Sequence, residues 1–293
     1  MKFGHVTGDE IDGVKFQLPP DHPDSILLQP NVIDNRDFQV FVGCGKWGIP
    51  AWVGPVYPEG TREKDYLDQY IKHFNSIELN GTFYRLSRNS IEKWSNTAQG
   101  TSLRFCPKWS HRITHLKRMK DIEENTQYFI DSIAALNENL GASFLTLPDN
   151  FGPKNVERVH AFLELVPDHY PIHIEFRHKD WFVEPVFSEI MQALEEKGIG
   201  TVITDVGLRR DVLHQRLTIR QVFVRFNGYS LHASDYMRLD DWIKRLVKWK
   251  EEGLQQVYFF MHQENEAHTP VLCTYFARKM NEIFGLQVPI PGS

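Results

Sequence analysis

Eight short apolar runs recur along this chain of 293 residues, and stretches with helical spacing separate most of them. The runs predict strands at 40–45, 76–80, 103–108, 143–147, 172–177, 199–205, 222–227 and 256–262. Apolar residues every three or four positions predict helices at 62–74, 89–97, 121–139, 155–166, 184–197, 236–252 and 267–284. Only the connection between 205 and 221 lacks a helical pattern. Strands joined by helical crossovers pair in parallel, and eight of them suit a closed α/β barrel of the TIM-like (β/α)8 type.

An open doubly wound sheet is the alternative to the barrel. Such a sheet normally carries a glycine loop that cradles phosphate after its first strand, and the segment at 43–48, GCGKWG, lacks the spacing of the standard nucleotide motifs. Residues 1–39 are rich in Pro, Asp and Asn and show no sustained period. We therefore predict one barrel domain at 40–285 with an irregular N-terminal extension at 1–39 wrapped around it.

Composition limits the cellular setting and the partners. The net charge of −5 and the pI near 6.2 give no support for a nucleic-acid or membrane partner, and no apolar stretch is long enough to span a bilayer. Two local basic groups, at 108–120 and 209–220, leave a nucleic acid or a phosphorylated ligand as an alternative partner. Cys44, Cys106 and Cys273 lack metal-ligand spacing, which predicts buried, reduced thiols in a cytoplasmic protein.

Polar side chains gather at the carboxyl ends of the predicted strands. Successive side chains alternate, so Ile77 and Leu79 face one side of their strand while Glu78 and Asn80 face the other. Five more strands are predicted to turn the following side chains to that same inner side: Arg104, Cys106 and Lys108; His173, Glu175 and Arg177; Ile203 and Asp205; Arg225 and Asn227; Tyr258, Phe260 and His262. In barrels of this type the carboxyl-terminal face holds the chemistry, so this set predicts one active-site mouth.

Two carboxylates are the candidates for acid–base catalysis. Glu175 and Glu78 can act as general acid and base, because burial raises a carboxyl pKa towards neutrality while a nearby cation lowers it. The structural alternative is that Glu78 pairs with Lys108, and Glu175 with Arg177 or Arg225. Asp205 completes the predicted catalytic set. A two-carboxylate glycosidase is disfavoured, because strands two and five are expected to lie well apart around the ring.

Three cations are predicted to bind the substrate. Lys108 could be an electrophile, an anion contact or a Schiff-base amine, and anion contact is the preferred interpretation because more cations follow it. Arg177 and Arg225 add planar donors from other strands, so the substrate is expected to be a small anionic or sugar-like compound. Asn80 and Asn227 are expected to bind the substrate as well, and Asn80 and Asp205 are expected to orient the catalytic and anion-binding side chains.

The predicted mouth also contains aromatic side chains and one possible set of metal ligands. The aromatic residues expected near the rim are Trp47, Trp52, Tyr57, Phe83, Tyr84, Trp109 and Trp181, either stacking on a ligand or packing the loops; Trp47 and Tyr84 are predicted to contact substrate. No cofactor is predicted. Glu175, Asp205 and His262 form the one set that could bind a divalent metal, and the three cations argue against it.

These residues resemble those of a known family, the YecE-like proteins or domain of unknown function 72. The resemblance runs from Val40 to about Phe284. It is carried by Gly43-Cys44-Gly45 with Trp47, Val56-Tyr57-Pro58, Glu78-Leu79-Asn80-Gly81-Thr82-Phe83-Tyr84, Phe105 to Lys108, Ile113-Thr114-His115, Leu147-Pro148, Glu175-Phe176-Arg177-His178 with Trp181, Asp205, and Val224-Arg225-Phe226. The resemblance implies a TIM-like barrel and implies no established reaction.

The chain departs from the family pattern at two places. It reads Arg225-Phe226-Asn227-Gly228 where the family usually has Arg-Leu-His-Gly, and Met261-His262-Gln263 where the family commonly has Asn-Asn. A catalytic role for His262 shared by the whole family is therefore not implied.

The sequence favours an enzyme that acts on a small anionic or sugar-like substrate by acid–base chemistry, as a hydrolase, lyase or isomerase. A non-catalytic binder of a phosphorylated ligand or nucleic acid is the rival from another class, and a metal-dependent phosphodiesterase is a third hypothesis. The sequence does not specify the oligomeric state.

Overall fold

The computed structural model describes residues 4, 8–28 and 38–292 and contains a parallel barrel. Its strands are β1 (Gln39–Cys44), β2 (Ser76–Leu79), β3 (Arg104–Pro107), β4 (Ser143–Thr146), β5 (Ile172–Glu175), β6 (Gly200–Asp205), β7 (Gln221–Gly228) and β8 (Gln256–Gln263). They are hydrogen-bonded in the order β3-β2-β1-β8-β7-β6-β5-β4, always in parallel. A parallel bridge between Lys108 and Phe144 links β3 to β4 and nearly closes the ring. The predicted TIM-like barrel is confirmed.

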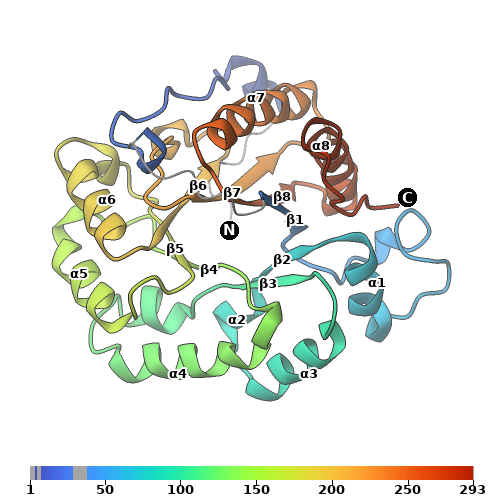
Figure 1. Ribbon diagram of the computed structural model, residues 1–293, viewed down its shortest axis with the longest axis horizontal. Coiled ribbons are helices and arrows are strands. Elements are labelled where there is room, and N and C mark those ends of the chain that lie inside the picture. Colours follow the sequence, from blue (N-terminus) through green and yellow to red (C-terminus); the bar gives the residue numbers. More distant parts are fainter. Residues whose placement is uncertain (1–3, 5–7, 29–37, 293) are drawn as a thin grey trace.

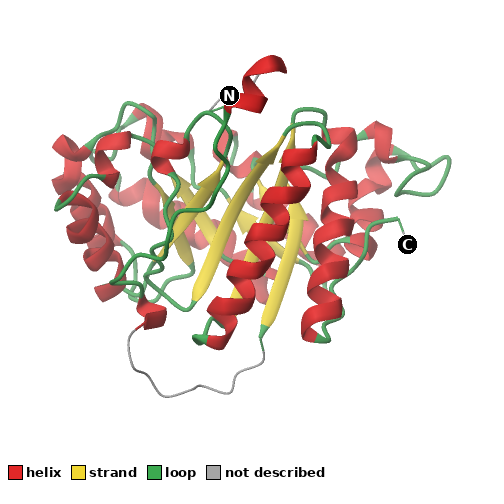
Figure 2. Cartoon of the chain, turned by 90° about the horizontal axis from the view of Figure 1, so that it is seen from above, coloured by secondary structure: helices red, strands yellow, loops and turns green. Residues whose placement is uncertain are grey.

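Helices surround the barrel (Figure 1). They are α1 (Tyr66–His73), α2 (Gly81–Tyr84), α3 (Arg88–Ala98), α4 (Glu123–Ile133), α5 (Val156–Leu165), α6 (Val186–Glu196), α7 (Ala233–Glu251) and α8 (Thr269–Phe284). Figure 2 shows the strands inclined inside this helical layer. As the sequence predicts, no α-helix joins β6 to β7 in the described chain, where the only helical element is a 3-10 turn at Arg210–Val212. In the described chain, no helix is both long enough and apolar enough to cross a membrane.

Local signals in the sequence set the limits of several helices. Ser87 caps α3 by accepting a hydrogen bond from the backbone N–H of Ser90 at 3.4 Å. Pro270 occupies the first turn of α8, where its missing N–H is no loss. That helix ends at Gly285, whose φ of 65° is the left-handed conformation that glycine adopts without a side-chain clash.

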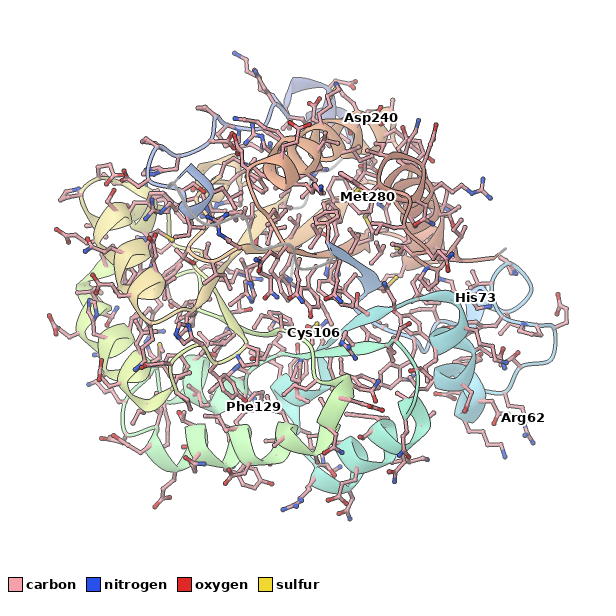
Figure 3. The ribbon with its side chains drawn as sticks, in the orientation of Figure 1. Arg62, His73, Cys106, Phe129, Asp240 and Met280 are labelled. Atoms are coloured by element: carbon pink, nitrogen blue, oxygen red, sulfur yellow. The ribbon has the colours of Figure 1, made fainter. Side chains whose placement is uncertain are left out.

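The strands separate two apolar layers. Their outward side chains, such as Ile77, Phe105 and Val224, pack beneath the helices in the main core. The inward layer forms a second core of Phe41, Cys106, Ala142, Phe144, Val202, Phe223, Tyr258 and Phe260, and Figure 3 shows Cys106 near the centre of the ring. Phe223 precedes Arg225 by two positions on β7, so an aromatic layer fills the barrel on the amino-terminal side of its polar residues. The polar layer therefore rests on a rigid floor.

Most of the aromatic residues expected at the rim are buried in the loops instead. Trp52, Tyr57, Trp109 and Trp181 are fully buried. The indole N–H groups of two of them donate hydrogen bonds to neighbouring segments. That of Trp181 donates to the Phe151 carbonyl at 2.7 Å, and that of Trp109 donates to Ser143 Oγ at 3.0 Å. Four of the predicted rim residues thus pack the loops. The three cysteines are buried and free, as expected from their spacing.

Part of the N-terminal extension lies along α7 (Figure 1, blue). Asp21 is the main contact: its carboxylate accepts hydrogen bonds from Arg245 Nη1 at 2.7 Å and from the Trp249 indole at 2.9 Å, and it pairs with Lys248. Residues 1–3, 5–7 and 29–37 of the predicted extension lie outside the described residues. Within 8–28, the contacts of Asp21 attach the extension to the barrel.

Replacing Asp21 with Ala should loosen this attachment. Because a hydrogen bond to a charged group is worth about 1.5–3 kcal/mol, we expect a loss of about 2 kcal/mol of unfolding free energy in urea and faster proteolysis within residues 8–28. Asp24→Ala is the matched control, because Asp24 is exposed and the contact of its carboxylate with His22 is long, at 3.9 Å. Equal effects of the two substitutions would show that Asp21 does not attach the extension.

Candidate active site

A cavity of about 600 Å³ opens at the carboxyl ends of the strands. Six of the predicted substrate-binding residues line it together with His262: Asn80, Tyr84, Lys108, Arg177, Arg225 and Asn227. Glu78 and Glu175, both fully buried, lie directly beneath the cavity, where both contact Arg225. The alternation along β2, β3, β5, β7 and β8 therefore predicted the correct faces.

Arg225 on β7 joins these two carboxylates. Its Nε donates to Glu78 Oε1 at 2.7 Å and its Nη2 donates to Glu78 Oε2 at 3.2 Å. Its Nη1 donates to both carboxylate oxygens of Glu175 at 3.1 Å. One guanidinium thus bridges β2 and β5 across the interior. The expectation that the carboxylates of these strands lie well apart is wrong, because the small interior lets both reach one side chain.

Glu175 is held by further donors. Arg177 Nη2 donates to its two oxygens at 3.1 and 3.2 Å. The hydroxyls of Thr146 on β4 and Thr204 on β6 each donate at 2.7 Å. These neighbours fix the rotamer of a carboxylate that has no contact with solvent.

The same neighbours determine the charge of Glu175. Burial by itself raises the pKa of this carboxyl, but the positive charges of Arg177, Arg225 and Lys108 outweigh it and hold the pKa well below its usual value. Glu175 is therefore ionised at neutral pH. A group that keeps its charge so strongly is a poor general acid.

Glu78 is likewise kept ionised. Burial raises its pKa, and the charges of Arg225 and His262 lower it well below the usual value. Asn80 Nδ2 donates to Glu78 Oε2 at 3.2 Å. His262 Nε2 lies 3.0 Å from the same oxygen, at ion-pair distance but outside hydrogen-bond geometry. The contacts match the structural alternative of ion pairing, with Arg225 in the place expected for Lys108.

Lys108 differs from the two arginines because its amine is uncommitted. The residue is 9% exposed, and its Nζ lies 4.6 Å from the ring centre of Phe83 and 5.6 Å from that of Phe144. Among the residues described by the structure, none forms a hydrogen bond or an ion pair with this Nζ. The Lys108 backbone is fixed, since its carbonyl accepts a hydrogen bond from the Thr82 hydroxyl at 2.7 Å.

The surroundings of Lys108 oppose its positive charge. Burial lowers the pKa of Lys108, and the charges of Arg225 and Arg177 lower it further, to about 7, against the weaker attraction of Glu175 and Glu78. The amine therefore titrates near neutral pH, which an ordinary lysine does not. This is the desolvated environment with a depressed lysine pKa that the sequence could not show.

Asp205 does not belong to this cavity. Its carboxylate accepts a hydrogen bond from the Trp242 indole at 2.7 Å and pairs with Arg238 at 2.8 Å and with Arg210, on the outer side of β6. The predicted inward face of β6 is wrong, because Thr204 and Val202 are the residues that point inward. Asp205 thus connects the barrel to α7 instead of lining the cavity.

Two other predicted placements also change. Trp47 is not among the residues lining the cavity and packs edge-on against Trp94, with ring centres 5.5 Å apart. The residues considered for a metal are separated, since Asp205 faces outward while Glu175 and His262 face inward. Across residues 4, 8–28 and 38–292, no group of three or more His, Cys, Asp and Glu side chains is arranged to hold a metal ion.

Sequence reasoning missed several residues that shape the cavity. Thr146 and Thr204 carry no charge and gave no signal beyond the alternation along their strands. Gly45 lets the rim close tightly, because a Cβ at that position would lie 3.0 Å from His262 Cε1 and 3.1 Å from Asn80 Nδ2.

Comparisons with known proteins agree with this architecture. The model of the family described as "Protein of unknown function DUF72" matches residues 41–291. The UPF0759 protein YecE of Escherichia coli strain K12 is 23% identical over 252 residues, covering 80% of this chain and 89% of that protein. The UPF0759 protein YunF of Bacillus subtilis strain 168 is 23% identical over 168 residues, covering 54% of this chain and 58% of that protein.

Solved structures show the same fold. A DUF72 family protein from Thermotoga maritima MSB8 is 25% identical, with a TM-score of 0.68 over 83% of this chain and 99% of that one. A DUF72 family protein from Enterococcus faecalis V583 is 17% identical, with a TM-score of 0.67 over 86% of this chain and 100% of that one.

Removing Lys108 and removing Arg225 should change the stability of the protein in opposite directions. Without Lys108, two arginines still balance two carboxylates, so Lys108→Met should raise the unfolding free energy at pH 7 by on the order of 2 kcal/mol. Arg225→Met leaves Glu78 without its main cation, so it should lower the unfolding free energy by about 3–5 kcal/mol. Urea unfolding measures both.

The pH dependence of the unfolding free energy provides a second test of the charge of Lys108. The folded pKa of Lys108 is about 7 and its ordinary value is 10.5, so the unfolded chain binds more protons between these values. Stability relative to the Lys108→Met variant should therefore rise as the pH increases from about 7 to 10.5. A flat difference across that window would mean that the Lys108 amine is charged in the folded protein.

Proposed function

The chain belongs to the DUF72 family, and from that premise we propose that it is an enzyme acting on a small anionic or sugar-like substrate at the carboxyl-terminal mouth of its barrel, with Lys108 as the group that exchanges a proton with the substrate. The observation that carries the proposal is the uncommitted, buried amine in the cavity. Burying a lysine without a partner lowers stability, so its presence is better explained by chemistry than by folding.

The remaining charged residues of the cavity would support Lys108. Glu78, Glu175 and Arg225 form a fixed ion-pair network, and such a network positions neighbouring groups without itself exchanging protons. Its role would be to maintain the electrostatic field that keeps the pKa of Lys108 near neutral pH. In this proposal the two carboxylates are positioning residues, and Lys108 takes the acid–base role that the sequence suggested for them.

The charge and shape of the cavity support a small, singly anionic ligand. Beneath the cavity, the cations Lys108, Arg177 and Arg225 face the carboxylates of Glu78 and Glu175, so one positive charge remains there when Lys108 is protonated. At the rim, Lys46 pairs with Glu266 at 2.9 Å, and Glu264 also lines the cavity. The amides of Asn80 and Asn227 supply donors and acceptors for hydroxyl or carboxylate oxygens. Tyr84, which is 73% exposed, offers a ring at the rim on which a sugar-like face can stack.

The test is a search for turnover that depends on Lys108. We expect the unmodified protein, incubated with a bacterial metabolite extract and followed by mass spectrometry, to consume at least one small anionic metabolite. Lys108→Met should slow this reaction by about 100-fold or more, because general acid–base groups contribute on that scale. The rate should rise with pH through about 7 if the neutral amine is the base.

The control is Lys93→Met, on the exposed surface of α3, which should leave the rate unchanged. Turnover that persists in Lys108→Met would remove Lys108 from the mechanism. Metabolites that bind without being converted would instead indicate a non-catalytic binding protein.

A further inference from the structure

We propose that Lys108 acts as a covalent nucleophile, forming an imine with the carbonyl carbon of an aldehyde or ketone that carries a carboxylate or a phosphate. The inference rests on the proposed function, because it assigns the substrate class and the bond formed in the same cavity. It goes further than proton exchange, since the substrate becomes attached to the chain.

The position of the Lys108 amine suits a nucleophile. It follows β3 at the carboxyl-terminal end of the barrel, and its Nζ faces the rings of Phe83 and Phe144 rather than an anion. An amine attacks a carbonyl only through a free lone pair, and a hydrogen-bonded or ion-paired ammonium lacks one. In the described part of the chain, Lys108 has neither kind of partner.

The titratable groups that face Lys108 come from three strands, from the segment after β5 and from one helical turn. Arg225 on β7 and Arg177 after β5 disfavour its protonation, while Glu175 on β5 and Glu78 on β2 favour it. His115 lies in the helical turn Arg112–Leu116, and burial followed by the charge of Lys108 lowers the pKa of its imidazole to about 4.

His115 is therefore neutral at pH 7 and adds no charge. With the two arginines tied to the two carboxylates, the cavity holds a lysine that can lose its proton at little cost.

The proposed step balances without an oxidant or a reductant. The neutral Nζ of Lys108 attacks the carbonyl carbon, one proton moves from this nitrogen to the carbonyl oxygen, and a carbinolamine forms. One proton from solution then converts the hydroxyl into a water molecule, which leaves, and a protonated imine remains. In total, one amine, one carbonyl and one proton yield one protonated imine and one water molecule, and the nitrogen–carbon double bond replaces the carbon–oxygen double bond.

The protonated imine explains why the substrate should carry a negative charge. It restores, beside Arg177 and Arg225, the positive charge that the cavity disfavours on Lys108. A carboxylate or phosphate on the same substrate offsets that charge as the imine forms. An uncharged ketone supplies no such compensation, so the cavity should select against it.

The proposal is tested by trapping the imine with borohydride, which reduces it to a stable secondary amine. The probes are pyruvate, which carries a carboxylate, dihydroxyacetone phosphate, which carries a phosphate, and acetone, which carries no charge. Peptide mass spectrometry locates the adduct. At pH 7 we expect at least about tenfold more adduct on Lys108 than on any other lysine with one of the two anionic probes, because an ordinary lysine is almost fully protonated there.

Matched variants separate this chemistry from reactions of surface lysines. Lys93→Met should give the same adduct as the unmodified protein, and Lys108→Met should give none at that site while its other lysines react to the same small extent. Preference for pyruvate or for dihydroxyacetone phosphate identifies the anion as a carboxylate or a phosphate. Equal trapping of acetone would overturn the assigned substrate class.

Failure of this inference is distinguishable from failure of the proposed function. If no probe labels Lys108 but turnover in the metabolite extract still requires it, the imine is overturned and proton exchange stands. If turnover survives in Lys108→Met, both are overturned. Mapping the adduct in the unmodified protein does not depend on the folding of any variant.

Discussion

The bridge that Arg225 makes between Glu78 and Glu175 is the interaction on which the cavity depends. Two fully buried carboxylates cannot remain ionised in a protein interior without compensating positive charge. Arg225 supplies it to both, from a strand that faces them across the barrel, and Arg177 completes the balance at Glu175. Because the four charges satisfy one another, the fifth charged group, Lys108, has no partner. Its low pKa follows from the pairing of its neighbours as much as from its own burial.

The barrel floor makes this arrangement rigid. Phe144, Phe223, Tyr258 and Phe260 fill the interior on the amino-terminal side of the polar layer and contact one another with ring centres between 4.9 and 6.4 Å apart. A close-packed interior resists shifts of the strands that carry the polar layer. The same strands thus carry two layers: an aromatic layer that supports the fold, and a polar layer that contains a buried lysine, which we expect to lower stability.

The sequence predicted the strands and most of the inward residues because both depend on periods of a few residues. It failed on β6, where Thr204 and Asp205 are both polar and alternation alone does not say which one faces the interior; the Trp242 indole and Arg238 guanidinium on α7, distant in sequence, decide it. The buried loop tryptophans were misplaced at the rim for a similar reason, since their hydrogen-bond partners are distant in sequence: the carbonyls of Phe151 and Glu266 for Trp181 and Trp52, and the Ser143 hydroxyl for Trp109. The low pKa of Lys108 could not be predicted from the sequence, because the charge balance of a cavity depends on which cations pair across the barrel. No local pattern records that pairing.

The account depends on one property, the charge of Lys108 in the folded protein. Heteronuclear NMR of protein carrying ¹⁵N- and ¹³C-labelled lysine reports the titration of each amine, and the signal of Lys108 is the one missing from Lys108→Met. The structure predicts a midpoint of about 7 for this amine. A midpoint near 10.5 would show that Lys108 is an ordinary ammonium group, and would contradict both its proton exchange and its reaction with carbonyl compounds.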